Sequence, residues 1–201
     1  MTLRYVLWDF GDTLVDQDWM LTAPEGYPDW PEAWCEAARG DTADAWYRNE
    51  LSCEDIARRV SESLGMPLAD TMNHIRRCCG DLRFFERPWK FAQACALPQA
   101  IVTVNPDLFS RYVVPAYELD QVFSVLVTSW EAKTVDKAEL CSQALERLGG
   151  GSPDEALLID NLEDNVRGWE RAGGIGYVYR GEAQFVLDMA GGLGGLFRAD
   201  S

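Results

Sequence analysis

The chain has 201 residues, of which 47% are hydrophobic and 11% aromatic, so it can bury one sizeable core, and it contains no run approaching the ~18 apolar residues that span a bilayer. Its 33 acidic residues outnumber 18 basic ones, and the resulting charge of -15 repels phosphate backbones and argues against a nucleic-acid partner. Arg4 and Asp9 interrupt the apolar N-terminus, which is therefore no secretory signal, so we expect a cytoplasmic protein with no membrane partner.

Five apolar runs of strand length follow one another along the chain, and many of their residues are β-branched or aromatic. They cover residues 5–8, 100–104, 122–128, 156–159 and 175–179. Between the runs, apolar residues recur at helical spacing, as in residues 138–148. Strands that alternate with helices in this way predict an α/β fold with a Rossmann-like parallel sheet.

Residues 16–85 interrupt this alternation, because they contain no convincing strand and carry helix-start signals such as Ser52 followed by Asp55. The segment follows the first strand, so we expect it above the carboxyl ends of the strands, where open α/β sheets bind ligands. We therefore predict a core of residues 1–15 and 86–190 and an inserted helical cap of residues 16–85. Residues 191–201 contain four glycines and are predicted to form a flexible tail.

The cap segment holds four tryptophans and the single histidine of the chain. The tryptophans, at positions 19, 30, 34 and 46, either line an apolar pocket or pack between helices, and the second alternative is favoured. His74 lies beside Arg76 and Arg77, which predicts a solvated helix face.

Polar residues follow four of the predicted strands, at the point where each strand ends. Because the carboxyl ends of parallel strands meet at one edge of a sheet, these side chains should converge there. An aspartate nucleophile can approach a phosphate dianion only when a cation neutralises the charge, and Mg²⁺ held by carboxylates suits that task. A hydroxyl and an ammonium would hold the phosphoryl oxygens. The candidates are Asp9, Thr103, either Lys133 or Lys137, and Asp160 with Asp164.

In order, these segments resemble the four motifs of the haloacid dehalogenase-like (HAD) hydrolases. The matching stretches are DFGDTL at Asp9, VTVN at Thr103, a lysine near a helix start, and IDNLEDN at Asp160. The resemblance covers residues 2–16 and 87–179, whereas the cap matches only in position and helical character. Lys137 is favoured over Lys133 because it begins the amphipathic helix, as the motif lysine does in some family members.

The resemblance implies a Mg²⁺-dependent phosphatase that acts on a small phosphorylated metabolite through an aspartyl-phosphate on Asp9. It also implies that Asp9, the carbonyl of Gly11 and Asp160 bind the Mg²⁺, and that Asp164 is a further ligand or supports one.

The chain departs from the family pattern at Gly11, where most phosphatases of the family carry a second aspartate that protonates the leaving group and activates water. Asp12 lies one position later, and successive residues of an extended segment point to opposite sides. Three interpretations follow: a phosphate with a good leaving group, such as an anomeric sugar phosphate or an acyl phosphate; an acid supplied by the cap; or chemistry other than phosphate hydrolysis.

The third interpretation has a specific form, because the family's dehalogenases also lack this aspartate and expel a halide, which needs no proton. Those enzymes do not need Mg²⁺, whereas this chain keeps Asp160 and Asp164 in the metal motif, which favours the phosphatase. A regulatory protein that binds phosphate or metal without turnover is the remaining alternative.

Overall fold

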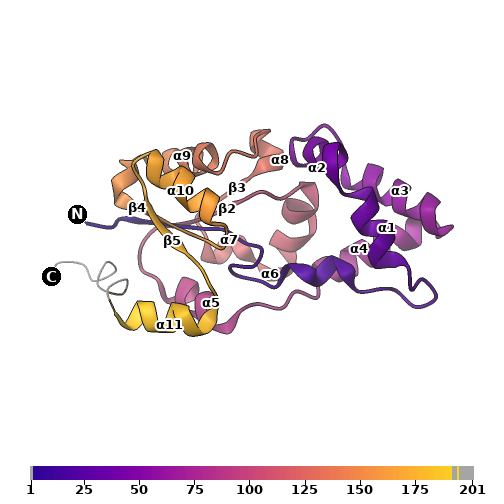
Figure 1. Cartoon of the computed structure of the whole chain (residues 1–201), viewed down its shortest axis with the longest axis horizontal. Coiled ribbons are helices and arrows are strands. Elements are labelled where there is room, and N and C mark those ends of the chain that lie inside the picture. The colour runs from indigo at the N-terminus through magenta and orange to yellow at the C-terminus, as the bar shows by residue number, and fades with distance from the viewer. Residues whose placement is uncertain (1, 192–193, 195–201) are drawn as a thin grey trace.

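Five parallel strands form the centre of the computed structural model, which describes residues 2–191 and 194 (Figure 1). They are β1 (Tyr5–Trp8), β2 (Gln99–Thr103), β3 (Val125–Thr128), β4 (Ala156–Asp160) and β5 (Ile175–Val178), in the order β3-β2-β1-β4-β5. Every pairing is parallel, so all the carboxyl ends lie at one edge of the sheet. The predicted α/β class and parallel sheet are confirmed. β3 is shorter than predicted because Val122 ends a helix instead of beginning the strand.

Successive side chains of each strand point to opposite faces of the sheet, and both faces are buried under helices. Val6 and Trp8 of β1 pack into one hydrophobic cluster, and Tyr5 and Leu7 pack into the other. Helices α9 (Lys137–Arg147) and α10 (Glu163–Arg171) lie on one side, and α5 (Glu86–Ala94) and α11 (Glu182–Ala190) on the other (Figure 1).

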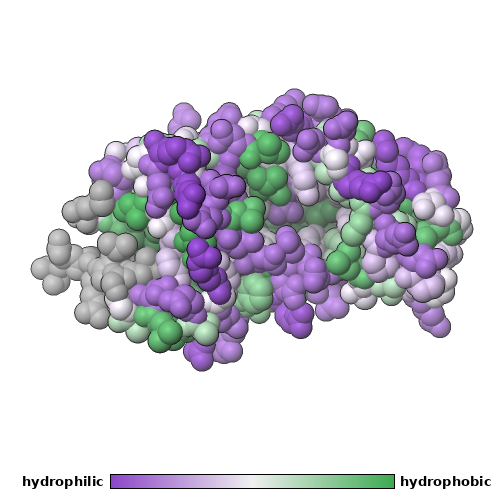
Figure 2. Space-filling model, viewed as in Figure 1, coloured by the Kyte–Doolittle hydropathy of each residue, from purple (hydrophilic) through white to green (hydrophobic). Residues whose placement is uncertain are grey.

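Shorter helical segments connect these layers. They are η1 (Gln17–Leu21), the π-helical turn η2 (Phe109–Val113), α6 (Val114–Tyr117), α7 (Leu119–Val122), α8 (Ser129–Ala132) and η3 (Pro153–Glu155). Hydrophilic residues cover most of the face in Figure 2. Among the described helices, none has both the length and the apolar character of a membrane span.

Four helices lie on the side of the molecule toward which β1 runs, where the third packs against the first and the fourth, and the second contacts the first through the rings of Trp46 and Trp34 (Figure 1). They are α1 (Trp30–Ala37), α2 (Gly40–Tyr47), α3 (Cys53–Leu64) and α4 (Leu68–Cys79). The predicted start of α3 is confirmed by a capping box, in which the Ser52 hydroxyl accepts from the Asp55 N–H and the Asp55 carboxylate accepts from the Ser52 N–H. We propose residues 16–85 as a cap, and the word is used for that segment below.

The chain leaves and re-enters the core at a single place. Val15 and Phe84 form an antiparallel bridge, and Asp16 N–H donates to the Arg83 carbonyl at 3.0 Å. The Asp16 carboxylate also pairs with the Arg83 guanidinium. The two connections of the cap therefore run side by side.

His74 does not lie on a solvated face, so that prediction is wrong. The side chain is buried, its ring contacts the edge of Trp30, and Nε2 donates to the Thr22 carbonyl at 2.7 Å. Burial lowers the pKa of His74, which favours the neutral ring. The reason is that α4 packs against η1, an arrangement that a local charge pattern does not reveal. Most of the predicted flexible tail lies outside the described residues, which include only 191 and 194 of it.

Candidate active site

A cavity of about 560 Å³ lies between the carboxyl ends of the strands and the cap. Asp9, Thr103 and Lys137 line it from the core. Asp9 directly follows β1, and its backbone N–H continues the sheet pairing by donating to the Ile159 carbonyl at 2.9 Å. The structure therefore brings together residues from three predicted motifs at one edge of the sheet.

Lys137 lies between two carboxylates. Its Nζ is 2.6 Å from Asp9 Oδ1, 3.0 Å from Asp160 Oδ2 and 2.8 Å from the Val102 carbonyl. These contacts match the three N–H donors of the ammonium, so Lys137 holds Asp9 in place and has no further donor for a phosphoryl oxygen. Lys133, the alternative lysine, is exposed at the left-handed end of α8.

The positive charge of Lys137 does not fully offset the negative charges of Asp9 and Asp160. Burial raises the pKa of Asp9 to about 6, although the Lys137 ammonium opposes that rise. Burial also acts to lower the pKa of Lys137, but the negative charges of Asp9 and Asp160 outweigh it and raise that pKa. Lys137 thus stays protonated. Two carboxylates and one ammonium give these three side chains a formal charge of -1, which attracts a further cation to the cavity.

Asp160 is predicted to be a metal ligand, but its side chain does not line the cavity. Its side chain is 0% exposed, and Oδ1 accepts from the Leu162 N–H at 2.8 Å. The Asn165 amide donates to both of its oxygens, at 3.2 and 3.0 Å. Asp160 therefore acts here as the partner of Lys137.

The structure does not bring Asp164, which is predicted to be a metal ligand or to support one, to the cavity. Asp164 is exposed on the first turn of α10 and does not line the cavity. The next residue of the helix, Asn165, is the one that faces Asp160. Asn161 lines the cavity, and its backbone N–H donates to the Thr13 hydroxyl at 3.1 Å. The residues after β4 that line the cavity are Asn161, Leu162 and Asn165, and none of them is a carboxylate.

Thr103 ends β2 inside the site, as predicted, and is buried. Its hydroxyl accepts from the Asn105 amide at 2.7 Å, which leaves the hydroxyl hydrogen for another acceptor. Our sequence reasoning missed Asn105, Asn161 and Asn165. Asn105 could have been found only from its place two residues after Thr103. Neutral amides carry no charge and so do not suggest a metal or phosphate site as carboxylates do.

No family model and no curated protein matches the sequence. Solved structures do match. A HAD family enzyme from Bacteroides thetaiotaomicron aligns with a TM-score of 0.71 at 16% identity, over 94% of this chain and 99% of that chain. A predicted HAD-like hydrolase from Porphyromonas gingivalis gives 0.65 at 15% identity, over 94% and 97% of the two chains. The L-2-haloacid dehalogenase from Xanthobacter autotrophicus gives 0.62 at 17% identity, over 95% and 84%.

This chain has the HAD-like fold. Other crystals of the Bacteroides and Xanthobacter enzymes contain, respectively, magnesium with inorganic phosphate and covalently bound chloropropionic acid. The HAD-like fold therefore supports more than one chemistry, and function has to be argued from the site of each chain.

Within this HAD-like fold, Gly11 lines the cavity without a left-handed backbone. A Cβ at this position would lie 3.2 Å from Gln17 Oε1, the end of a flexible side chain. Asp12 has a left-handed backbone, with φ at 52°, and does not line the cavity. The carboxylate that the family pattern has at this position is therefore missing here, and Asp12 does not line the cavity in its place.

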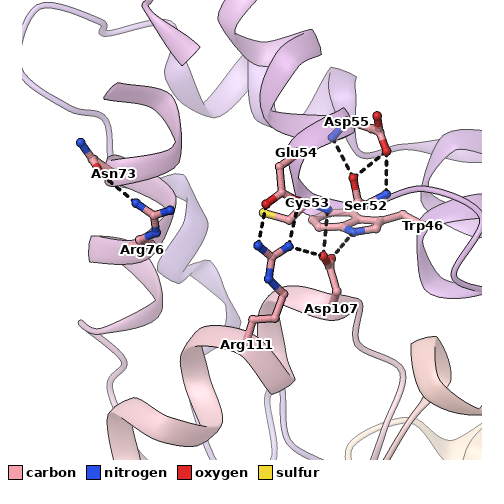
Figure 3. A network of polar contacts seen from close by, with 9 residues as sticks. All are labelled: Trp46, Ser52, Cys53, Glu54, Asp55, Asn73, Arg76, Asp107 and Arg111. Carbon is pink, nitrogen blue, oxygen red and sulfur yellow. Dashed lines mark hydrogen bonds and ion pairs between the residues drawn. The ribbon is translucent and has the colours of Figure 1, made fainter. Parts of the chain in front are cut away.

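Five residues join the cap to the core in a network that we call the Asp107 latch: Trp46, Cys53, Glu54, Asp107 and Arg111 (Figure 3). The buried Asp107 carboxylate accepts from Trp46 Nε1 at 2.8 Å, from the Cys53 N–H at 3.1 Å and from Arg111 at 2.9 Å. Arg111 also donates through two nitrogens to Glu54. The latch fixes the Trp46 indole, which lines the cavity.

Proposed function

We propose that this protein is a HAD-type, Mg²⁺-dependent hydrolase of a small phosphorylated metabolite and that Asp9 is its nucleophile. The observation that carries the proposal is the setting of the Asp9 carboxylate. Lys137 holds Oδ1 at 2.6 Å, while Oδ2 has the Thr13 hydroxyl only at 3.5 Å. A carboxylate held by one oxygen is fixed in orientation and keeps the other oxygen for attack.

The proposed reaction has two displacements at phosphorus. Asp9 Oδ2 forms a bond to phosphorus while the bond from phosphorus to the leaving oxygen breaks, and the leaving group departs with the electron pair. Water then attacks the phosphorus of the aspartyl-phosphate, which releases inorganic phosphate and regenerates Asp9. Thr103 and Asn161 line the same cavity, and in this proposal the Thr103 hydroxyl and the Asn161 amide would donate to phosphoryl oxygens.

The residues at the cavity fit a magnesium ion that binds together with phosphate. Asp9, the Gly11 carbonyl and Asn161, which are among the residues that line the cavity, would hold the ion. No group of three or more carboxylate, histidine or cysteine side chains suited to a metal occurs among the described residues. Mg²⁺ is commonly held by one or two carboxylates plus substrate phosphates, and the net charge of -1 favours a cation. The ion would supply neutralisation of the phosphate charge.

A phosphate-release screen tests this proposal. Acetyl phosphate and an anomeric sugar phosphate, whose leaving groups need little protonation, are offered to the wild-type protein with Mg²⁺ or with EDTA. We expect release that requires Mg²⁺. Release that persists unchanged in EDTA would contradict the role of the metal.

A dehalogenase is the second candidate, and Gly11 is the observation that favours it, because a halide departs without a proton. Release of halide from 2-chloropropionate in EDTA would support this candidate over the phosphatase. A third possibility is a protein that binds phosphate and metal without turnover. It is identified when beryllofluoride binds with Mg²⁺ while no phosphate or halide is released from any substrate tested.

Restoring the missing carboxylate should widen the range of substrates. Gly11→Asp is expected to raise kcat/KM for alkyl phosphates by roughly 10- to 100-fold, within the usual contribution of a general acid. The new Cβ would lie 3.2 Å from Gln17 Oε1, the end of a flexible side chain that can shift. Gly11→Asn is the matched control, since it has the same size and cannot transfer the proton. An equal gain in both variants would rule out acid catalysis as the cause.

A carboxylate at position 161 should strengthen the binding of Mg²⁺. Asn161→Asp adds a negative charge at the cavity, and we expect the affinity for Mg²⁺ with phosphate present to rise by about tenfold or more. Calorimetric titration with Mg²⁺ measures this without turnover. Asp164→Asn should leave the affinity unchanged, and a matching loss there would show that Asp164 reaches the metal.

A further inference from the structure

The wall of the cavity that the cap provides is mostly apolar and contains four aromatic residues. Its apolar residues include Trp19, Met20, Leu21, Trp34, Trp46 and Tyr47. The core wall contributes the polar residues Asp9, Thr103 and Lys137 next to apolar ones such as Phe10 and Leu108. The sequence favoured packing between helices for these tryptophans; three of the four line the cavity, and Trp30 is fully buried behind them.

The aromatic wall is fixed in place before any ligand binds. The Trp34 ring lies 5.9 Å from the Trp46 ring and 6.0 Å from the Trp30 ring, measured between centroids. The Asp107 latch holds the Trp46 indole through a hydrogen bond of 2.8 Å. Rigid rings lose little conformational entropy when a ligand packs on them.

The cavity offers no cation for a second negative charge. Among the described residues that line it, Lys137 is the only cationic side chain, and its donors already contact Asp9, Asp160 and a backbone carbonyl. The exposed Asp18 adds negative charge. A leaving group with its own carboxylate or phosphate would lose hydration and gain no partner.

The absence of a carboxylate at Gly11 also restricts the leaving group. Without an acid at this position, a leaving group whose oxygen can depart as an anion is favoured. A phenol has a pKa of about 10, as in tyrosine, so its anion departs far more readily than an alkoxide. The aromatic residues, the lack of a free cation among the described lining residues and the missing acid together favour an uncharged aromatic leaving group.

We infer that the substrate class is an aryl phosphate monoester whose aromatic body is uncharged. This inference rests on the proposed function, in which Asp9 Oδ2 forms the bond to phosphorus and the aryl oxide departs with the electron pair of the broken bond, then takes a proton from solvent. The volume of about 560 Å³ lies within the range of small-molecule sites and accommodates a phosphoryl group with an aromatic group.

Two uncleavable probes test the inference by binding alone. Phenylphosphonate and methylphosphonate share the anionic group and differ in the ring, and their binding with Mg²⁺ is followed by tryptophan fluorescence. We expect phenylphosphonate to bind at least about tenfold more tightly, and Trp34→Leu to remove most of that preference. Tyr47→Leu, at a half-buried position, takes its place where Trp34→Leu does not fold. Trp89→Leu is the matched control outside the cavity and should keep the preference.

Turnover separates this inference from the proposed function. Phenyl phosphate should exceed 4-carboxyphenyl phosphate in kcat/KM by about tenfold, although the carboxylated phenol is intrinsically the better leaving group. Equal binding of the two phosphonates, or faster turnover of the carboxylated ester, would overturn the aromatic class even if acetyl phosphate is hydrolysed. If no phosphate is hydrolysed, acetyl phosphate included, the proposed function fails and the inferred substrate class with it, whatever the phosphonates do.

Discussion

Asp9→Asn is expected to lower the rate of phosphate release by about 10³-fold or more, because it removes the attacking oxygen and its charge. The exchange is nearly isosteric, and Lys137 keeps its contact with Asp160, so the fold should persist. The measurement is kcat at saturating substrate and Mg²⁺, with circular dichroism to verify folding.

Asp12→Asn is the matched control for this substitution. Asp12 lies three residues from Asp9, does not line the cavity, and has a left-handed backbone that asparagine tolerates. We expect activity close to wild type. Undiminished turnover in Asp9→Asn would assign the attack to another group.

Lys137→Met is expected to lower the free energy of unfolding by about 3–5 kcal/mol at pH 7, because it leaves Asp9 and Asp160 buried without a cation. The loss should shrink as the pH falls. Without the ammonium, the pKa of each carboxylate rises in the folded state, so protonation at lower pH relieves the repulsion. Urea denaturation of variant and wild type at pH 7 and pH 5 measures both effects.

Lys133→Met is the control for the second prediction. Lys133 is exposed, so its replacement should change the free energy of unfolding by no more than about 0.5 kcal/mol. Equal losses in the two variants would show that Lys137 contributes by its bulk or its helix position instead of by charge.

The sequence predicted the sheet well because each strand is a short apolar run with its own local signature. It also predicted that Asp9, Thr103 and Lys137 would meet, since each lies at or after the carboxyl end of a strand and parallel strands end at one edge.

The topology does not predict which side chains of the loop after β4 face the cavity. Whether Asp160 or Asn161 faces the cavity depends on how the backbone turns after β4, and whether Asp164 or Asn165 faces Asp160 depends on one step of about 100° around α10. Carboxylates were favoured as ligands by residue type. The structure shows that the turn places the amide of Asn161 at the cavity instead.

Contacts between distant segments were equally hidden. Trp46 and Asp107 are 61 positions apart, and neither has a motif that announces the other. His74 carries the local pattern of a surface helix and is buried by the packing of α4 against η1. Such contacts follow from the three-dimensional arrangement of the helices.

The side-by-side crossing at Val15 and Phe84 makes the cap a segment that can be exchanged. Because the ends of the insertion are already close, a replacement of another length costs little extra loop-closure entropy and need not displace β1 or β2. The constraint on a graft lies at Asp107 and Arg111 on the core surface. A new cap must bring hydrogen-bond donors to Asp107 and a carboxylate to Arg111. A cap without them would bury both charges without partners.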